Sequence, residues 1–283
     1  MSTDHTFAVV TDSTADIAPA LAAERSIEVV PLLVTFGDES FSDGVLSQAE
    51  FFERMAASPK LPTTSQPSVG AFTAAYERAL ATAPEVISLH ISSALSGTVA
   101  SARQAAEEFA GRVHVFDSLN LSWGLALQVL DAAAAAAEGL STTAALERLT
   151  RTRDRAKMIV GVDSLDNLAR GGRIGKVSAF LGSLLDLKVT LTLDENGAFT
   201  PVKRTRGEKA ALAHTLDWVD QQMAGRRRGM FAVGHAMTRE RALRLRDELL
   251  ARYEVTEMHV YEAGSVVAAH TGTVWGVALL PAE

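Results

Sequence analysis

The 283-residue sequence contains no cysteine. This excludes a disulfide framework, a thiolate metal site and a cysteine nucleophile, and it fits a reducing compartment. Positive charge is in the minority, with 27 Lys and Arg against 34 Asp and Glu. The resulting net charge of −7 argues against nucleic acid as the main partner, because binding nucleic acid begins with neutralising phosphates.

Long apolar runs and export signals are also missing. The nearest approach to an apolar run, residues 125–137, is interrupted by Gln128 and Asp131, whereas a membrane-spanning helix needs about 18 apolar residues in succession. The first six residues contain no Lys or Arg, and the apolar stretch 7–10 is too short for a signal peptide. We therefore expect a soluble cytoplasmic protein with no integral membrane segment.

Nucleotide-binding motifs are absent from the sequence. Gly175-Lys176 resembles the end of a phosphate-binding loop, but Arg170 and Val177 occupy the positions of its first glycine and its hydroxyl residue. No dinucleotide-binding glycine motif and no G-x-S-x-G motif occurs. Histidines and carboxylates show no metal-ligand spacing. The sequence thus indicates no ATP site, no metal and no resident cofactor.

The first half of the chain alternates short β-rich runs with helical segments. Hydrophobic residues make up 47% of the chain, which is enough for a sizeable core. Strands are expected over residues 7–11, 27–36, 85–91 and 113–116, and helices over 15–25, 48–57, 69–81, 96–109 and 123–138. Pro31 marks the second strand as irregular or as an edge strand, and the prolines of 58–67 predict a loop. This alternation favours a parallel sheet with helices on both faces.

The second half predicts a mixed sheet with helices. Asn196-Gly197 lies between two apolar runs, which is a strong hairpin signal. Strands are expected over 158–162, 189–193, 198–202, 229–234, 257–261 and 273–280, and helices over 146–156, from the glycines near 171–175 through Leu185, over 209–223 and over 239–251. The fold class is therefore α/β with two domains: a three-layer α/β/α domain over 1–155 and a two-layer α/β domain over 156–283, with the boundary near 141–156.

Short polar turns follow several of the expected strands. Three strands end in Asp-Ser, at Asp12-Ser13, Asp117-Ser118 and Asp163-Ser164, and a fourth ends in Ser92-Ser93. Each pair alone is typical of an ordinary helix or turn cap. Together they predict a crevice beyond the carboxyl ends of the strands, where open parallel sheets bind ligands. Hydroxyls and free backbone N–H groups there suit a small anionic group.

The remaining candidates are hydroxyl-rich turns, one histidine and two arginines. Residues 63–68 present hydroxyls between prolines, or simply cap the next helix. Ser96-Gly97-Thr98 opens a helix whose N-terminus favours an anion, or is a plain cap. His270 is either a hydrogen-bonded core residue or a site residue. Arg173 and Arg206 are loop cations that are commonly just solvated, as expected also of Arg226–Arg228.

Seven motifs occur in an order that resembles the DegV family of fatty-acid-binding proteins. They cover residues 11–16, 41–44, 64–68, 96–98, 117–118, 171–174 and 270–272. The resemblance spans residues 9 to 272 and implies the two-domain fold described above, with the ligand between or beside the domains. The sequence departs from some members at Val99, where an aromatic residue is common, and at Val189-Thr190. Both departures bear on acyl-chain preference.

The resemblance also implies a function and a set of site residues. Family members bind one long-chain fatty acid, of the palmitate or oleate type. Bacteria with the two-component fatty acid kinase use such a protein to present the acid to a separate ATP-binding kinase subunit, which makes an acyl-phosphate for phospholipid synthesis. Thr64 and Ser96 would hold the carboxylate, with Gly97 and His270 completing the network. Ser65 and Thr271, next to these positions, would also bind the fatty acid. Arg173 and Arg206 match family arginines linked to kinase engagement and phosphoryl transfer.

Burial energetics agree with a fatty-acid ligand. About 14 methylenes at about 0.8 kcal/mol each give a gross gain of about 11 kcal/mol, while an unpaired buried carboxylate is costly. Two other classes of function stay open. One is a lipid-binding or regulatory protein without a kinase partner. The other is a serine hydrolase that uses Ser93 or Ser96 with His270.

Overall fold

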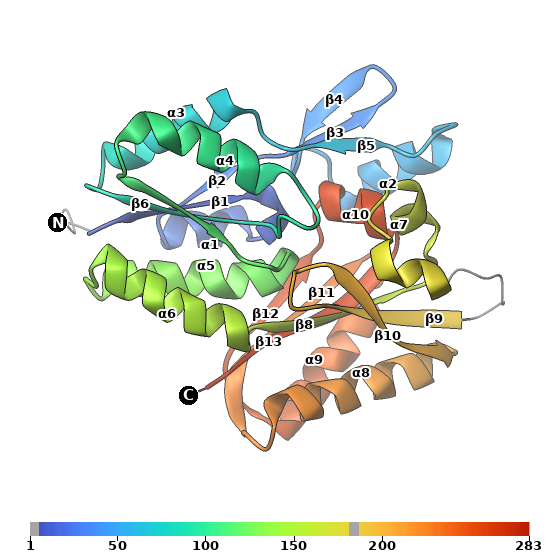
Figure 1. Cartoon of the computed structure of the whole chain (residues 1–283). Helices are drawn as coiled ribbons and strands as arrows, with labels where there is room; N and C mark the ends of the chain where they lie inside the picture. The colour runs from blue at the N-terminus through green and yellow to red at the C-terminus, as the bar shows by residue number, and fades with distance from the viewer. Residues whose placement is uncertain (1–5, 181–186, 283) are drawn as a thin grey trace.

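The computed structural model describes residues 6–180 and 187–282. Four strands form a parallel sheet, sheet A, in the order β2-β1-β6-β7 (Figure 1). Helices α3 and α4 lie on one face of sheet A, and α1 and α5 lie on the other. The bounds are β1 (Ala8–Asp12), β2 (Ile27–Val30), β6 (Val86–His90), β7 (Val113–Asp117), α1 (Pro19–Glu24), α3 (Val69–Leu80), α4 (Thr98–Ala106) and α5 (Ser122–Ala137). The predicted α/β/α arrangement of the first half is confirmed.

Six strands form a mixed sheet, sheet C, in the order β10-β9-β8-β13-β11-β12. Only β11 and β12 are parallel, and the other neighbours are antiparallel. Helices α8 (Glu208–Met223) and α9 (Arg239–Arg252) cover one face. The strands are β8 (Lys157–Val162), β9 (Leu187–Leu193), β10 (Phe199–Arg206), β11 (Arg228–Ala236), β12 (Glu254–Glu262) and β13 (Val274–Pro281). The predicted mixed sheet and its hairpin around Asn196-Gly197 are confirmed.

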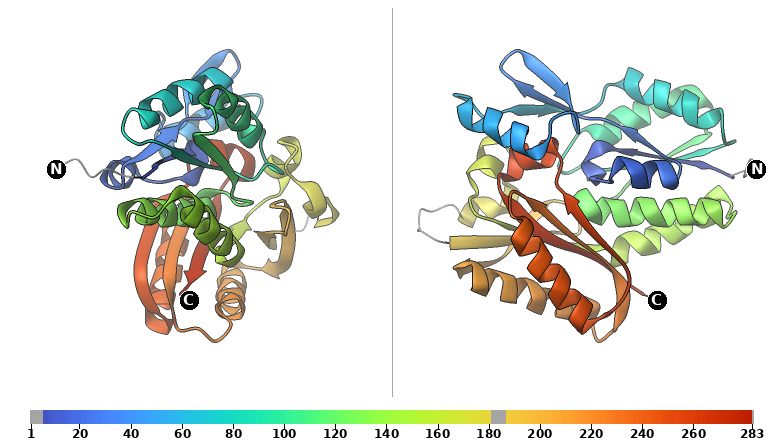
Figure 2. Two further views of the ribbon diagram at one scale, coloured as in Figure 1. Left: turned by 60° about the vertical axis from the view of Figure 1, so that its left-hand side comes forward. Right: turned by 180° about the vertical axis from the view of Figure 1, so that it is seen from behind.

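Helix α5 lies between the two sheets, with α6 (Thr142–Arg155) beside it (Figure 2). It contacts β1 and β6 of sheet A as well as β8 and β13 of sheet C. Nearly every residue of α5 is buried, because both of its faces meet a sheet, and its alanines allow the close approach. One apolar core therefore continues from Val9 through Leu127 to Val160. The boundary at residue 155 stays a prediction.

A small antiparallel sheet, sheet B, was not predicted. It has the order β4-β3-β5 and consists of β3 (Leu33–Phe36), β4 (Glu39–Ser42) and β5 (Thr63–Ser65). The expected strand over 27–36 is divided at Pro31, which has no N–H to donate, and its two halves join different sheets. The first half, β2, is an edge strand, as predicted. The expected loop over 58–67 contains β5, which is too short to show a period in the sequence.

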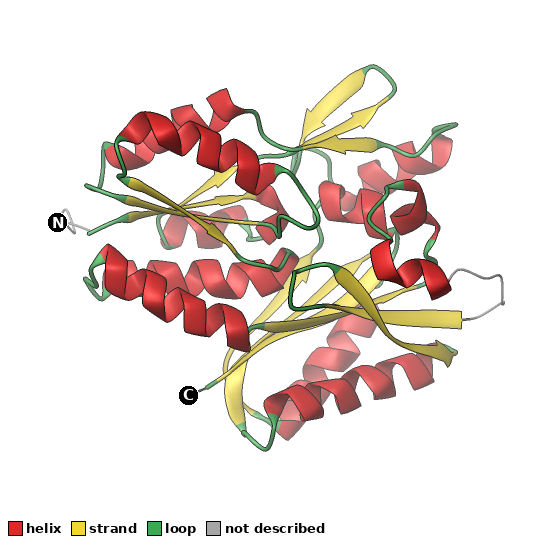
Figure 3. Cartoon of the chain, in the orientation of Figure 1, coloured by secondary structure: helices red, strands yellow, loops and turns green. Residues whose placement is uncertain are grey.

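Figure 3 shows the helices and strands of the structure, and several helix predictions need correction against them. The helix expected from residue 15 begins only at Pro19, after the 3-10 turn η1 (Ser13–Ala15) and Asp16 in the left-handed conformation. The helix expected over 96–109 is α4 followed by the 3-10 turn η2 (Glu107–Phe109). Helix α6 starts four residues before its expected start at 146, and α7 (Asp166–Arg170) was not predicted. The predicted helix through Leu185 is the 3-10 turn η3 (Gly175–Phe180) as far as the structure describes it, and residues 181–186 lie outside the described part.

Two short helices frame the later argument. Helix α2 (Gln48–Ala57) has the predicted capping box of Ser47 and Glu50. Helix α10 (Ser265–Thr271) was not predicted, because its buried apolar residues show no helical period. No helix in the described ranges combines the length and the apolar character needed to cross a membrane.

Candidate functional site

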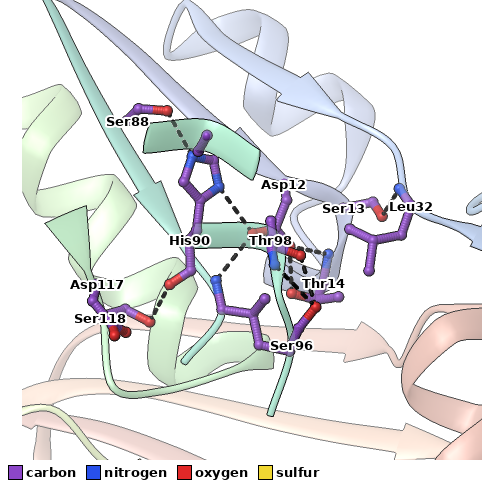
Figure 4. A network of polar contacts seen from close by, with 12 residues as sticks. Asp12, Ser13, Thr14, Leu32, Ser88, His90, Ser96, Thr98, Asp117 and Ser118 are labelled. Carbon is purple, nitrogen blue, oxygen red and sulfur yellow. Dashed lines mark hydrogen bonds and ion pairs between the residues drawn. The ribbon is translucent and has the colours of Figure 1, made fainter. Parts of the chain in front are cut away.

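The carboxyl ends of β1, β6 and β7 carry a buried polar network (Figure 4). One carboxylate oxygen of Asp12 lies 3.0 Å from His90 Nδ1 and accepts the Ile91 N–H, also at 3.0 Å. The other oxygen accepts the backbone N–H and the hydroxyl of Thr14. His90 Nε2 is 2.6 Å from Ser88 Oγ. Ser118, which follows β7, donates its hydroxyl to the His90 carbonyl at 2.7 Å. The three neighbouring strand ends therefore gather as predicted, but many of their polar groups bind one another.

The turn after β8, at Asp163-Ser164, lies elsewhere. Asp163 follows β8 in sheet C and pairs with Lys188 at 2.9 Å and with Arg241 at 2.9 Å. These hydrogen bonds and cations hold the pKa of Asp163 below its usual value against a desolvation cost. A single crevice built from all four turns is thus wrong, because β8 belongs to another sheet.

A small cavity lies next to the Asp12 network, between sheets A, B and C and α10. Its volume is about 40 Å³. Five of the predicted site residues line it: Thr64, Ser96, Arg173, His270 and Thr271. Its other lining residues are Thr14, Leu32, Ile91, Leu95, Leu121, Phe199, Val266 and Val267. The cavity therefore has a polar end and apolar walls. We call it the head-group cavity, after the role proposed for it below.

His270 and Thr64 are in direct contact inside this cavity. Thr64 Oγ1 on β5 lies 2.8 Å from His270 Nε2, in the last turn of α10. Burial, and then the positive charge of Arg173, lower the pKa of His270 to about 4. The imidazole is therefore neutral at neutral pH. Its buried Nδ1 has no hydrogen-bond partner within the described residues.

Backbone contacts hold the other polar groups of the cavity. Ser96 Oγ is 2.8 Å from Thr98 Oγ1 and accepts the Thr98 N–H at the start of α4. Arg173 donates from Nε to the Leu95 carbonyl at 3.1 Å and from a terminal nitrogen to the Gly171 carbonyl at 2.8 Å. The guanidinium is thus fixed at the cavity by carbonyl groups. Thr271 donates its hydroxyl to Val267 within α10.

Three predicted residues lie outside the head-group cavity. Ser65 follows Thr64 on β5 and is exposed, because successive side chains of a strand point to opposite faces. Gly97 packs on Gln66, where an added Cβ would lie 2.2 Å from the Gln66 amide oxygen. Arg206 is exposed at the end of β10. The structure thus gives Gly97 a packing role and leaves Ser65 and Arg206 at the surface.

A second, larger cavity of about 1010 Å³ lies beside α1 and β12, on the other side of α10. Asp16 and Asp43 line it together with Trp123, His259 and Tyr261. The Trp123 ring lies 4.3 Å from the His259 ring and 5.2 Å from the Tyr261 ring, between centroids. Asp16 and Asp43 belong to two of the quoted motifs, but no sequence signal indicated that they meet. No cluster of three or more His or carboxylate groups suited to a metal occurs in the described residues.

The fold and this site define a class of protein: an α/β protein with two large sheets and a small interior cavity that has a polar end and apolar walls. The chain belongs to the DegV family, because the family model described as "Uncharacterised protein, DegV family" matches residues 6–282. A DegV domain-containing protein of Deinococcus radiodurans is 42% identical over 97% of this chain and 98% of its own length.

Two solved structures show the same fold. One is a DegV family protein from Thermus thermophilus, described by its fatty acid binding, with 39% identity, a TM-score of 0.93 and coverage of 97% of this chain and 99% of that one. The other is DegV from Bacillus subtilis, described as a fatty acid binding protein, with 31% identity, a TM-score of 0.88 and coverage of 99% and 100%. The resemblance seen in the sequence is confirmed as family membership.

Proposed function

We propose that this protein binds one long-chain fatty acid and presents its carboxylate to a separate ATP-binding kinase subunit. The observation that carries the proposal is the contact between Thr64 and His270 in a cavity that Ser96 and Arg173 also line. Two related proteins of known structure are fatty-acid-binding proteins, which supports the same ligand class. Hydroxyl groups that donate hydrogen bonds, together with a nearby cation, reduce the cost of burying a carboxylate.

The charges of the cavity favour an anionic head group. Arg173 is permanently charged, and its field lowers the pKa of His270. A bound carboxylate would offset that field. The Thr64 and Ser96 hydroxyls would donate hydrogen bonds to the carboxylate, and so reduce the cost of burying it.

The acyl chain needs apolar side chains of the cavity to move apart. A volume of about 40 Å³ suits a carboxylate, since one water occupies about 30 Å³ in the liquid. The walls formed by Leu121, Phe199 and Val266 are apolar and nearly fully buried. We propose that the acyl chain enters between these walls, where the burial of each methylene contributes about 0.8 kcal/mol to binding.

The kinase partner is the part of the proposal that the family resemblance implies, and two features agree with it: the sequence lacks a nucleotide-binding motif, and the two arginines lie at the cavity and at the surface. The sequence contains no nucleotide-binding motif, so a phosphoryl group would come from another protein. Arg173 lies at the head-group cavity, and Arg206 is exposed at the end of β10. Cations at these places would balance charge during phosphoryl transfer and engage the partner.

The two alternatives make different predictions. A lipid-binding protein without a kinase partner would retain the fatty acid but support no acyl-phosphate formation. A serine hydrolase would need His270 to contact a serine and an orienting carboxylate. His270 contacts Thr64 instead, and its Nδ1 has no partner within the described residues. The geometry therefore favours binding over hydrolysis.

Mass spectrometry of the purified protein tests the proposal. Native spectra are expected to show about one fatty acid per chain, and organic extraction should then identify it. Mixing the loaded protein with a fatty acid kinase subunit and ATP should yield acyl-phosphate. A chain that carries no lipid and takes up neither palmitate nor oleate would contradict the lipid site. A loaded chain without product would support the regulatory alternative.

A further inference from the structure

Helix α10 carries His270 but has no capping side chain of its own. It begins after Gly264, which has no side chain to accept a hydrogen bond. The first N–H groups of a helix need partners from outside the helix. Two carboxylates from the first half of the chain supply acceptors here. Asp16 accepts the Gly264 N–H at 2.8 Å, and Asp43 accepts the Val266 N–H at 3.2 Å.

Each carboxylate is itself held on its second oxygen. Ser122 at the start of α5 donates to Asp16 at 2.5 Å. Ser13 donates to Asp43 at 2.8 Å and accepts the N–H of Leu32, a residue of the head-group cavity wall. Contacts with Ser122 of α5 and with Ser13 after β1 thus hold the two carboxyl groups in addition to their contacts with α10. Their link to α10 joins parts of the chain more than 220 residues apart.

Asp16 and Asp43 leave little space around residue 264, which explains why a glycine occupies this position. A Cβ added to Gly264 would lie 2.9 Å from an Asp16 oxygen and 3.1 Å from both Asp43 oxygens. The absence of a side chain lets both carboxylates reach the backbone. The same short helix ends at His270, whose ring contacts Thr64. Both ends of α10 are therefore tied to the first half of the chain.

We propose that Asp16 and Asp43 are positioning residues, which hold the N-terminus of α10 so that His270 meets Thr64 in the head-group cavity. The role of His270 toward a fatty acid rests on the proposed function, but the positioning itself does not. Neither carboxylate lines the head-group cavity. Their contacts with α10 are made to the backbone N–H groups at its N-terminal end, while His270 lies in its last turn.

Both carboxyl groups are buried, and their pKa values reflect the cost of burying negative charge at this place. Burial raises the pKa of Asp16 to about 8, and the charge of Asp43 adds to this rise. Burial likewise raises the pKa of Asp43. Two neighbouring anions in this position would be costly, and a pKa of about 8 leaves Asp16 mostly protonated at neutral pH, where a neutral carboxyl group still accepts the Gly264 N–H. Hydrogen bonds from Ser122, Ser13 and the α10 backbone lower that cost.

Alanine and asparagine substitutions in the full chain test the proposal. Asp16→Ala and Asp43→Ala remove the acceptors. Asp16→Asn and Asp43→Asn keep one oxygen acceptor and are expected to behave like the wild-type protein. Asp131→Ala is the matched control, because Asp131 binds Arg148 and Thr152 in the α5–α6 pair, away from α10. The readouts are the titration of His270 by ¹⁵N NMR, assigned with His270→Gln, and the Kd for palmitate.

In the alanine variants the pKa of His270 is expected to rise from about 4 toward its ordinary value of about 6.5. Palmitate affinity should fall about fivefold to tenfold, the loss that follows when one hydrogen bond goes unmade. Folded alanine variants with an unchanged His270 titration would overturn the proposal, as would an equal change in Asp131→Ala. A changed titration with unchanged palmitate affinity would support positioning and count against His270 as a head-group ligand. Where an alanine variant fails to fold, Asp16→Ser or Asp43→Ser, whose shorter side chains do not reach α10, replaces it.

Discussion

At the scale of single residues, the direction of a side chain decides whether that residue lines the head-group cavity. Thr64 points into the head-group cavity, while Thr63 and Ser65 on either side of it are exposed. The hydroxyl-rich run 63–68 was recognised in the sequence as a candidate. Which hydroxyl faces the cavity depends on the pairing of β5 with β3, where Thr64 lies opposite Val34.

Replacing Thr64 with valine removes one hydroxyl at similar volume. We expect palmitate affinity to fall about fivefold, because the lost hydrogen bond is worth about 1 kcal/mol. The measurement is a binding titration, with Thr63→Val as the control on the exposed face of the same strand. Unchanged affinity in Thr64→Val would remove Thr64 from the head-group site.

The protonation of His270 should report on the ligand. Its pKa of about 4 in the folded chain lies below the ordinary value of 6.5. Between these pH values the unfolded chain binds more protons, so folding stability contributed by this group falls as pH falls. A bound carboxylate offsets the charge of Arg173 and should raise the pKa. NMR titration of His270 with and without palmitate measures this, and identical midpoints would contradict binding beside the imidazole.

At the scale of elements, the loop after α7 is shaped to fit the histidine. The backbone of Gly171 packs against His270, and an added Cβ would lie 2.3 Å from Nδ1 and 3.0 Å from the Asn167 carbonyl. The Gly171 carbonyl also accepts a hydrogen bond from Arg173. This loop, α10 and β5 therefore set the polar end of the cavity together, although they are far apart in the sequence.

Gly171→Ala should displace His270 and weaken palmitate binding, while the melting temperature changes little. Gly70→Ala is the matched control, because Gly70 lies in α3 with nothing within 4 Å of an added Cβ. In that control the protein is expected to gain about 0.5–1 kcal/mol of stability, since alanine favours a helix over glycine, and to bind palmitate normally. Equal affinities in the two variants would show that the loop does not position His270.

On the scale of the whole molecule, the two sheets share one core through α5, and the head-group cavity opens where they meet. Arg206 lies apart from this core, exposed at the end of β10. Its place suits contact with another protein. This separates the proposed ligand site from the proposed partner contact.

Arg206→Ala is expected to leave palmitate affinity intact and to lower the rate of acyl-phosphate formation with the kinase subunit and ATP. The control is Arg226→Ala, in an exposed arginine run between α8 and β11. Both variants are assayed for palmitate binding and for product. Equal losses of binding and transfer in Arg206→Ala would contradict a role in the partner interface.

The sequence by itself determined the fold class, the order of most helices and strands, and the residues Thr64, Ser96, Arg173, His270 and Thr271 that meet in one cavity. These follow from local signals: apolar runs, caps such as Ser47, the Asn196-Gly197 turn, and short motifs that match a family. Only the tertiary structure decided that β5 turns Thr64 inward and Ser65 outward, that Asp163 belongs to another sheet, and that Asp16 and Asp43 cap α10. The physical reason is that these outcomes depend on hydrogen bonds between residues distant in the chain, which leave no periodic or local trace in the sequence.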